Sequence, residues 1–128
     1  MTINSASTLV AEALNEIKTI SPSEALEKVN NNTCNLIDIR DVRELERLGR
    51  IENSLHVPRG MLEFWMDPDS QYFKDGKIDM NKVMVLFCAG GLRSALATKT
   101  LQSMGFKNIC DVDGGFGSMQ NSGFKVVK

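Results

Sequence analysis

Hydrophobic positions along the chain form short continuous runs, separated by segments in which apolar residues follow a helical spacing. The runs predict strands at residues 36–39, 54–57, 83–87 and 108–112, with a last strand near 125–127. Residues 83–87 are apolar throughout, as expected for a central parallel strand that is covered on both faces. Strands that alternate with helices predict an α/β fold with a mainly parallel sheet.

An amphipathic helix is predicted close to the start of the chain. Its apolar face is formed by residues spaced at i, i+3, i+4 and i+7: Val10, Ala13, Leu14 and Ile17. We expect this face to pack on the core, and a partner-binding helix is the alternative. The chain is therefore interpreted as an N-terminal helix within residues 1–20, packed on a single domain at 21–128.

A second helix is predicted to begin after Ser21, which can cap it, with Glu24 at the position of a capping box. Further helices are expected at residues 41–50, 61–66 and 92–104, and a short one before the last strand. Gly105 ends the helix at 92–104, and residues 74–77 are expected to form a loop.

Composition narrows the classes of function. The 128 residues are 42% hydrophobic and 24% charged, which is typical of one globular domain. A formal net charge of −1 gives no reason to expect a nucleic acid or a membrane surface as partner. The chain has no apolar run of transmembrane length, and its start lacks the pattern of a secretory signal, so a cytoplasmic location is the default expectation.

The three cysteines are Cys34, Cys88 and Cys110, an odd number at wide spacing that does not indicate a disulfide framework. His56 is the only histidine, so a zinc site would need all four of these residues to converge, and we expect no metal. Neither Cys34 nor Cys110 has a glycine loop followed by an arginine, and both are expected to be structural.

Cys88 is the candidate nucleophile, because it follows the most apolar strand and sites in such sheets lie at the carboxyl ends of strands. The segment reads Cys88-Ala89-Gly90-Gly91-Leu92-Arg93-Ser94. The two glycines allow successive backbone N–H groups to point inward, and the following helix N-terminus and Arg93 add positive charge. This setting favours a thiolate and could also hold an anionic sulfur bonded to it.

No general base accompanies Cys88, since His56 is expected to be structural. A Cys–His hydrolase needs such a base. Sulfur transfer does not, because a thiolate can attack the outer sulfur of thiosulfate and sulfite leaves as a stable anion. The residues therefore favour sulfur transfer over hydrolysis.

From about residue 22 to residue 127 the sequence resembles the rhodanese family. Asp38-Ile39-Arg40 looks like its Asp-x-Arg signature, with Glu44 at the following acidic position. Residues 88–94 match its C-x-x-G-x-R-S active-site pattern, and residues 105–109 and 113–115 match its C-terminal signatures. The resemblance implies a rhodanese-like fold: a five-stranded, mainly parallel sheet flanked by helices on both faces.

The resemblance also implies a thiosulfate sulfurtransferase that carries the transferred sulfur as a persulfide on Cys88. Backbone N–H groups from Ala89 to Arg93 would stabilise the sulfur, and Arg93 would add charge and order the loop. The expected substrate-binding residues are Ala89, Gly90, Gly91, Leu92 and Ser94, with Arg59 as a second cation. Asp38, Arg40 and Glu44 are expected to be structural.

The implied donor is a small anion such as thiosulfate, and the implied acceptor is cyanide, a thiol or a protein thiol. No metal or organic cofactor is implied, and the oligomeric state is left open. The chain departs from the family at residues 49–54, which lack its usual histidine, and near Met119, where a tryptophan is common. The lone tryptophan, Trp65, lies in a segment at 59–65 that either borders the site or packs in the core.

Two other functions remain open at this point. The first is a persulfide carrier or sulfide-binding module loaded by a protein desulfurase, which would use the same residues. The second is a cysteine phosphatase or arsenate reductase, families that use a Cys-x5-Arg loop. Only four residues separate Cys88 from Arg93, which suits a single sulfur better than a tetrahedral phosphate.

Overall fold

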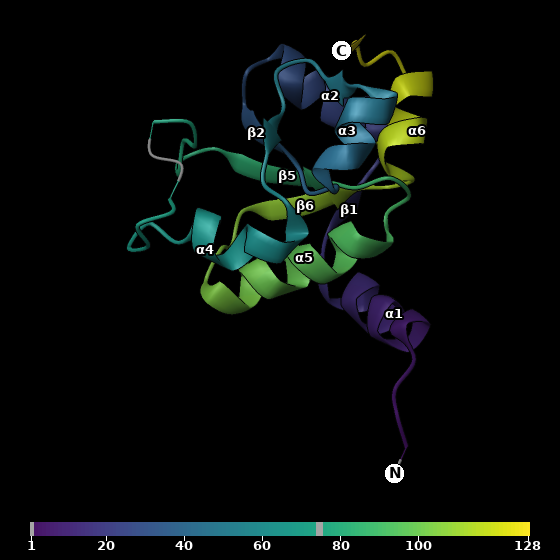
Figure 1. Cartoon of the computed structure of the whole chain (residues 1–128), viewed down its shortest axis with the longest axis vertical. Helices are drawn as coiled ribbons and strands as arrows, with labels where there is room; N and C mark the ends of the chain where they lie inside the picture. Colours follow the sequence, from purple (N-terminus) through teal and green to yellow (C-terminus); the bar gives the residue numbers. More distant parts are fainter. Residues whose placement is uncertain (1, 74–75) are drawn as a thin grey trace.

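The computed structural model describes residues 2–73 and 76–128, so the predicted loop at 74–77 lies partly outside the described residues. Its main sheet has five strands, all parallel, in the order β1-β6-β5-β2-β4 (Figure 1). The strands are β1 (Thr19–Ile20), β2 (Cys34–Asp38), β4 (Leu55–His56), β5 (Val83–Phe87) and β6 (Ile109–Val112). The predicted α/β fold with a parallel sheet is confirmed, and β5 is its central strand.

The last predicted strand does not belong to this sheet. It is β7 (Val126–Val127), which pairs antiparallel with β3 (Arg50–Ile51) in a separate two-stranded ribbon. The fifth strand of the main sheet is instead β1, which falls within residues 1–20, assigned from the sequence to an N-terminal helix. A strand of two residues is too short to show a period, which is why the sequence did not reveal it.

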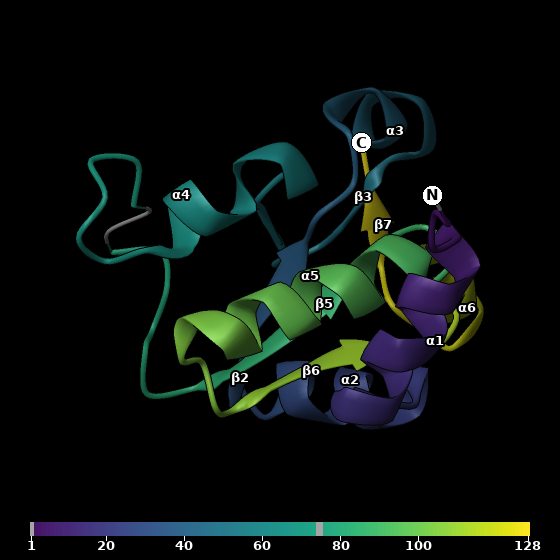
Figure 2. The ribbon, with the colours of Figure 1, turned by 90° about the horizontal axis from the view of Figure 1, so that it is seen from below.

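Helices cover both faces of the sheet. They are α1 (Ala6–Glu16), α2 (Pro22–Asn30), α3 (Val42–Leu48), the 3-10 turn η1 (Arg59–Met61), α4 (Leu62–Met66), α5 (Leu92–Met104) and α6 (Gly115–Asn121). Figures 1 and 2 show α4 and α5 on one face, α2 and α6 on the other, and α1 beside α5. Among the helices of the described residues, none has the length and hydropathy to cross a membrane.

Alternation along β5 divides the core into two layers. Met84 and Leu86 pack with α4 and α5, whereas Val85 and Phe87 pack with α2 and α6. Cys88, the next residue after the strand, belongs to the layer of Met84 and Leu86. The strand register therefore directs the Cys88 side chain to the face that α5 covers.

The N-terminal helix α1 packs on α5. Val10 and Ala13 are buried against Ala95 of α5. Leu14 was assigned to the same face, but its residue is 45% exposed. It lies along a groove between α1 and α5 rather than inside the contact.

Candidate active site

The sulfur of Cys88 lies at the junction between β5 and α5 and accepts hydrogen bonds from two backbone N–H groups. Gly91 N donates at 3.1 Å and Ser94 N at 3.3 Å. Gly91 is the N-cap residue of α5 and has φ +102°, a left-handed conformation that glycine adopts without strain. The loop thus curls back so that the first turn of α5 points at the sulfur.

The N–H groups expected to surround the sulfur were those from Ala89 to Arg93. Gly91 belongs to that set, and Ser94 supplies the second donor from one position beyond it. These N–H groups belong to the N-terminal turn of a helix, where positive partial charge collects. Cys88 is only 1% exposed, so the donors act in a site with little water.

The start of α6 supports the same loop from behind. The Phe116 N–H donates to the Cys88 carbonyl at 2.8 Å. Gly115 has φ +61°, and a Cβ atom there would overlap the carbonyl oxygen of Cys88 and the backbone of Ala89. The glycines at 114–115, noted from the sequence as a signature, therefore permit a close approach of two backbones.

Arg93 binds Glu44 of α3 rather than the sulfur. Its Nη1 and Nη2 atoms donate to the two carboxylate oxygens of Glu44 at 2.7 and 3.0 Å. The same carboxylate accepts the Asp41 N–H at 3.0 Å and completes a capping box for α3. Hydrogen bonds from Arg93 hold the pKa of Glu44 below its usual value, and the pKa of Arg93 is raised in turn.

Asp38 and Arg40 form an ion pair with no exposed side-chain surface, 2.8 Å between Nη2 and Oδ2. Arg40 also donates to the Gly49 carbonyl at 3.0 Å, and its guanidinium lies 4.0 Å above the Phe116 ring. This pair connects the end of β2 to the end of α3 and to α6. Such an arrangement suits the loop anchor expected for Asp38 and Arg40.

The buried carboxylate of Asp111 lies behind the loop and was not predicted from the sequence. Ser94 Oγ donates to Asp111 Oδ2 at 2.9 Å, and Thr19 Oγ1 donates to Asp111 Oδ1 at 2.6 Å. Burial raises the pKa of Asp111. Ser94 therefore joins the sulfur, through its N–H, to a polar network that reaches β1. The sequence signal that could have indicated Asp111 is that it is the one acidic residue in the otherwise apolar strand β6.

Three other residues discussed from the sequence are Arg59, His56 and Trp65, and the structure shows what each of them contacts. Arg59 donates to Thr100 Oγ1 at 3.4 Å and pairs with Glu63 at 3.7 Å, contacts that lie toward α4 and the middle of α5. His56 Nε2 lies 2.6 Å from the Arg40 carbonyl oxygen, as suits a structural histidine. Trp65 packs against the core layer beneath α5.

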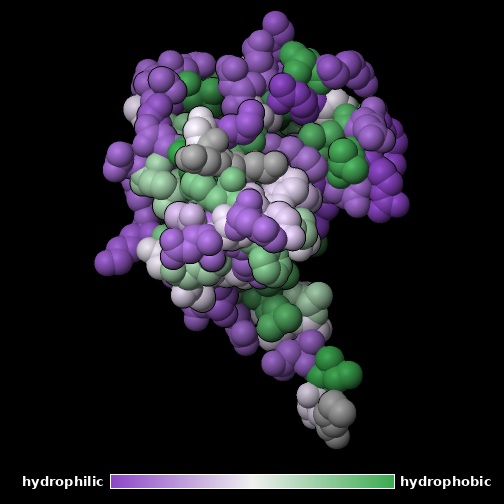
Figure 3. Space-filling view, turned by 60° about the vertical axis from the view of Figure 1, so that its left-hand side comes forward, coloured by the Kyte–Doolittle hydropathy of each residue, from purple (hydrophilic) through white to green (hydrophobic). Residues whose placement is uncertain are grey.

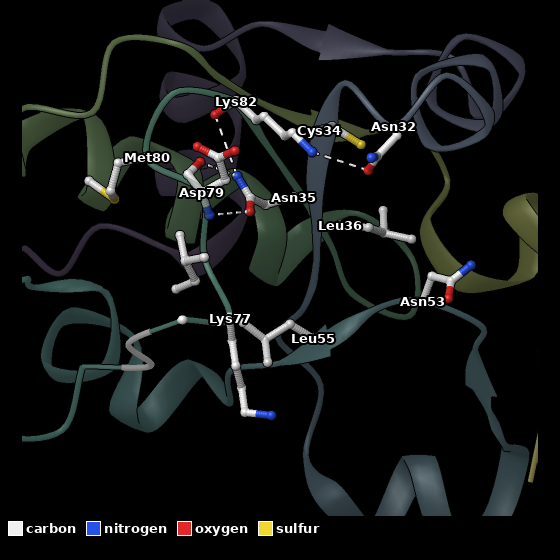
Figure 4. Close-up of a pocket in the computed structure, with 12 residues that line it drawn as sticks. Asn32, Cys34, Asn35, Leu36, Asn53, Leu55, Lys77, Asp79, Met80 and Lys82 are labelled. Atoms are coloured by element: carbon white, nitrogen blue, oxygen red, sulfur yellow. Dashed lines mark hydrogen bonds between the residues drawn. The ribbon is translucent and has the colours of Figure 1, made fainter.

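A polar cavity of about 490 Å³ lies at the opposite edge of the sheet, at the amino ends of β2 and β5 (Figure 4). Cys34 and Asn35 line it, and Lys82 donates to Asn32 Oδ1 there at 3.1 Å. Burial raises the pKa of Cys34, and it raises that of Cys110 to about 11. Cys34, the cysteine that lines this cavity, therefore ionises less readily than a free thiol, so the cavity offers no activated nucleophile.

Comparison with known proteins identifies a family and several relatives of known structure. The sequence model of the Rhodanese-like domain matches residues 21–122. A polysulfide-sulfur transferase homodimer from Wolinella succinogenes is 32% identical, with a TM-score of 0.72 over 92% of this chain and 83% of that one.

A Rhodopseudomonas palustris protein, described as of unknown function and a possible tyrosine phosphatase, is 42% identical. Its structure has a TM-score of 0.88 over 99% of this chain and 98% of that one. The tRNA uridine(34) hydroxylase of Chlamydia felis is 32% identical over 101 residues, which are 79% of this chain. The chain spans only 30% of the length of that relative.

Proposed function

The chain belongs to the rhodanese-like domain family, and from this premise we propose that it is a sulfurtransferase working through a persulfide on Cys88. The sulfur donor is thiosulfate or a similar small anion. The observation that carries the proposal is the pair of N–H groups, from Gly91 and Ser94, that point at the Cys88 sulfur. They stabilise negative charge at the atom where a nucleophilic thiolate must form.

The reaction has two half-reactions. In the first, the Cys88 thiolate attacks the outer sulfur of thiosulfate, the S–S bond of the donor breaks, and sulfite leaves with the electron pair. In the second, cyanide or a thiolate attacks the outer sulfur of the persulfide, and Cys88 leaves as a thiolate. In each step an anionic nucleophile attacks and an anionic leaving group departs, so no proton has to be moved. No general base, metal or organic cofactor takes part in this scheme.

Each residue of the loop has a role in this scheme. Gly91 and Ser94 hold the anionic sulfur through their N–H groups, and Ala89, Gly90 and Leu92 shape the rim. Arg93 orders the first turn of α5 through its pair with Glu44. Arg59 remains a candidate second cation, farther from the sulfur than the loop residues. Its hydrogen bond to Thr100 is long at 3.4 Å, so this contact holds the guanidinium only weakly.

We propose small-molecule and thiol partners in the cytoplasm rather than a nucleic acid. The formal net charge of −1 supports this, because nucleic-acid binding depends on excess basic charge. The relatives named for tRNA are longer proteins, and the match covers 29% to 32% of their length.

A phosphatase is less consistent with the site. The loop has four residues between Cys88 and Arg93, and both terminal nitrogens of Arg93 are engaged by Glu44. A phosphate group would need that guanidinium free to bind its oxygens.

Turnover of thiosulfate and cyanide to thiocyanate tests the proposal. We expect Cys88→Ser to abolish it, whereas Cys34→Ser and Cys110→Ser keep most of it. A Cys88→Ser protein with the full rate would overturn the assignment. A wild-type protein that ignores thiosulfate but accepts sulfur from a desulfurase would instead be a persulfide carrier.

A further inference from the structure

An apolar groove runs between α1 and the first turns of α5. Its volume is about 480 Å³, within the range of small-molecule sites, and its lining is almost wholly apolar. Residues that line it include Val10, Ala11, Leu14, Leu92, Arg93 and Leu96. Figure 3 shows hydrophobic surface on the narrow N-terminal end of the molecule, where α1 lies.

The groove borders the loop that carries Cys88. Leu92 is bonded to Gly91, whose N–H lies 3.1 Å from the Cys88 sulfur. Adding one Cα–Cα step places the backbone of Leu92 less than about 9 Å from that sulfur. The groove and the Cys88 loop are therefore neighbours, and a thiol whose apolar body lay in the groove would have only this distance to cover.

The groove offers no free charge to a ligand. Arg93 contributes its aliphatic stem to the lining, while Glu44 binds its guanidinium. Leu14 and Leu92 are 45% and 66% exposed, so apolar side chains face water on both walls. A ligand with an apolar body would remove these surfaces from water, whereas a small anion such as thiosulfate would gain nothing there.

One wall of the groove lies outside the region that the family model matches. The family model begins at residue 21, whereas α1 spans Ala6–Glu16. The loop and α5 alone would leave Leu92 and Leu96 without an opposing surface. Helix α1 thus turns one side of α5 into an apolar groove next to the Cys88 loop.

We propose that this groove binds the apolar body of the sulfur acceptor, a small thiol with an aliphatic or aromatic group. The inference rests on the proposed persulfide at Cys88 and adds the class of acceptor. The acceptor thiolate attacks the outer sulfur, a new S–S bond forms, and the bond to Cys88 breaks. The products are the acceptor's persulfide anion and the Cys88 thiolate.

The test uses protein loaded with thiosulfate and then freed of donor. Discharge by 2-mercaptoethanol or 6-mercaptohexanol is followed as the loss of one sulfur atom from the intact mass. The quantity compared is the ratio of the second-order rate constants for the longer and the shorter thiol. Burying one methylene is worth roughly a fourfold change, so we expect Leu14→Ser to lower this ratio about fivefold.

Leu9→Ser is the matched control, because Leu9 is 42% exposed on the same helix and does not line the groove. We expect its ratio to equal that of the wild type. Ala11→Phe, which fills the groove, should lower the ratio as Leu14→Ser does, and discharge by cyanide should be unchanged in all variants. The two thiols differ in intrinsic reactivity, but this difference enters the ratio of every variant equally, so it cancels when a variant is compared with the wild type.

The outcomes separate the two proposals. Equal ratios in wild type, Leu14→Ser and Ala11→Phe would overturn the groove as an acceptor site while leaving the persulfide intact. A wild-type protein that gains no sulfur at Cys88 would overturn the proposed function, and the acceptor site with it.

Discussion

Arg93 and Glu44 form a two-pronged ion pair that joins the first turn of α5 to α3 across 49 positions of sequence. The arginine of the loop therefore does not contact the sulfur of Cys88. Its hydrogen bonds fix the turn that carries the Ser94 N–H, one of the two donors to that sulfur. In this geometry Arg93 is a positioning residue.

Glu44→Gln should make the protein less sensitive to acid. The pKa of Glu44 is lowered in the folded state, so its pairing stabilises the fold above the unfolded pKa and is lost as pH falls through the folded pKa. We expect the wild type to lose about 1 kcal/mol more than Glu44→Gln between about pH 5 and 3. Urea unfolding at the two pH values measures this.

Glu24→Gln is the control for that experiment, because Glu24 forms an exposed pair with Lys28 at 4.0 Å. Its acid sensitivity should match that of the wild type. A Glu44→Gln protein with unaltered pH dependence would show that the pair with Arg93 contributes nothing to the folded state.

Asp111→Asn should have the opposite dependence on pH. Burial raises the pKa of Asp111, so the ionised carboxyl costs stability as pH rises from about 4 through the folded pKa. The stability advantage of the wild type over Asp111→Asn should shrink between pH 3 and pH 7, roughly the span over which a raised carboxyl titrates. An advantage of the wild type that grows with pH would contradict the account.

Gly115→Ala should destabilise the fold and disturb the loop. The added Cβ atom would overlap the Cys88 carbonyl, and alanine is strained at φ +61°. We expect a loss of about 2 kcal/mol or more, and slower sulfur transfer. Gly117→Ala in the same helix has no atom within 4 Å of the new Cβ, so it should be neutral or slightly stabilising. Equal effects in urea unfolding would contradict the predicted overlap.

The position of Cys88 could be predicted because its signals are local. An apolar run, a double glycine and a helical segment follow one another within about twenty residues of chain, and each has a direct structural meaning. The rule that sites lie at the carboxyl ends of parallel strands then identified the loop.

Contacts between distant segments could not be predicted in the same way. The pairing of Arg93 with Glu44 depends on the position of α3 relative to α5 in the folded chain. No local sequence pattern encodes that position. Likewise, Thr19 and Asp111 meet because β1 pairs with β6, and β1 is too short to be recognised. Leu14 fits a helical period, but whether it is buried depends on the width of the groove beside α5.

The central claim is that Cys88 carries the transferred sulfur, and intact mass tests it most directly. Wild type and Cys88→Ser are each incubated with thiosulfate, and their intact masses are measured before and after treatment with cyanide. We predict that the wild type alone gains one sulfur atom, which cyanide removes as thiocyanate. A gain of sulfur on Cys88→Ser, or a wild type whose mass does not change with thiosulfate or a polysulfide, would contradict the account.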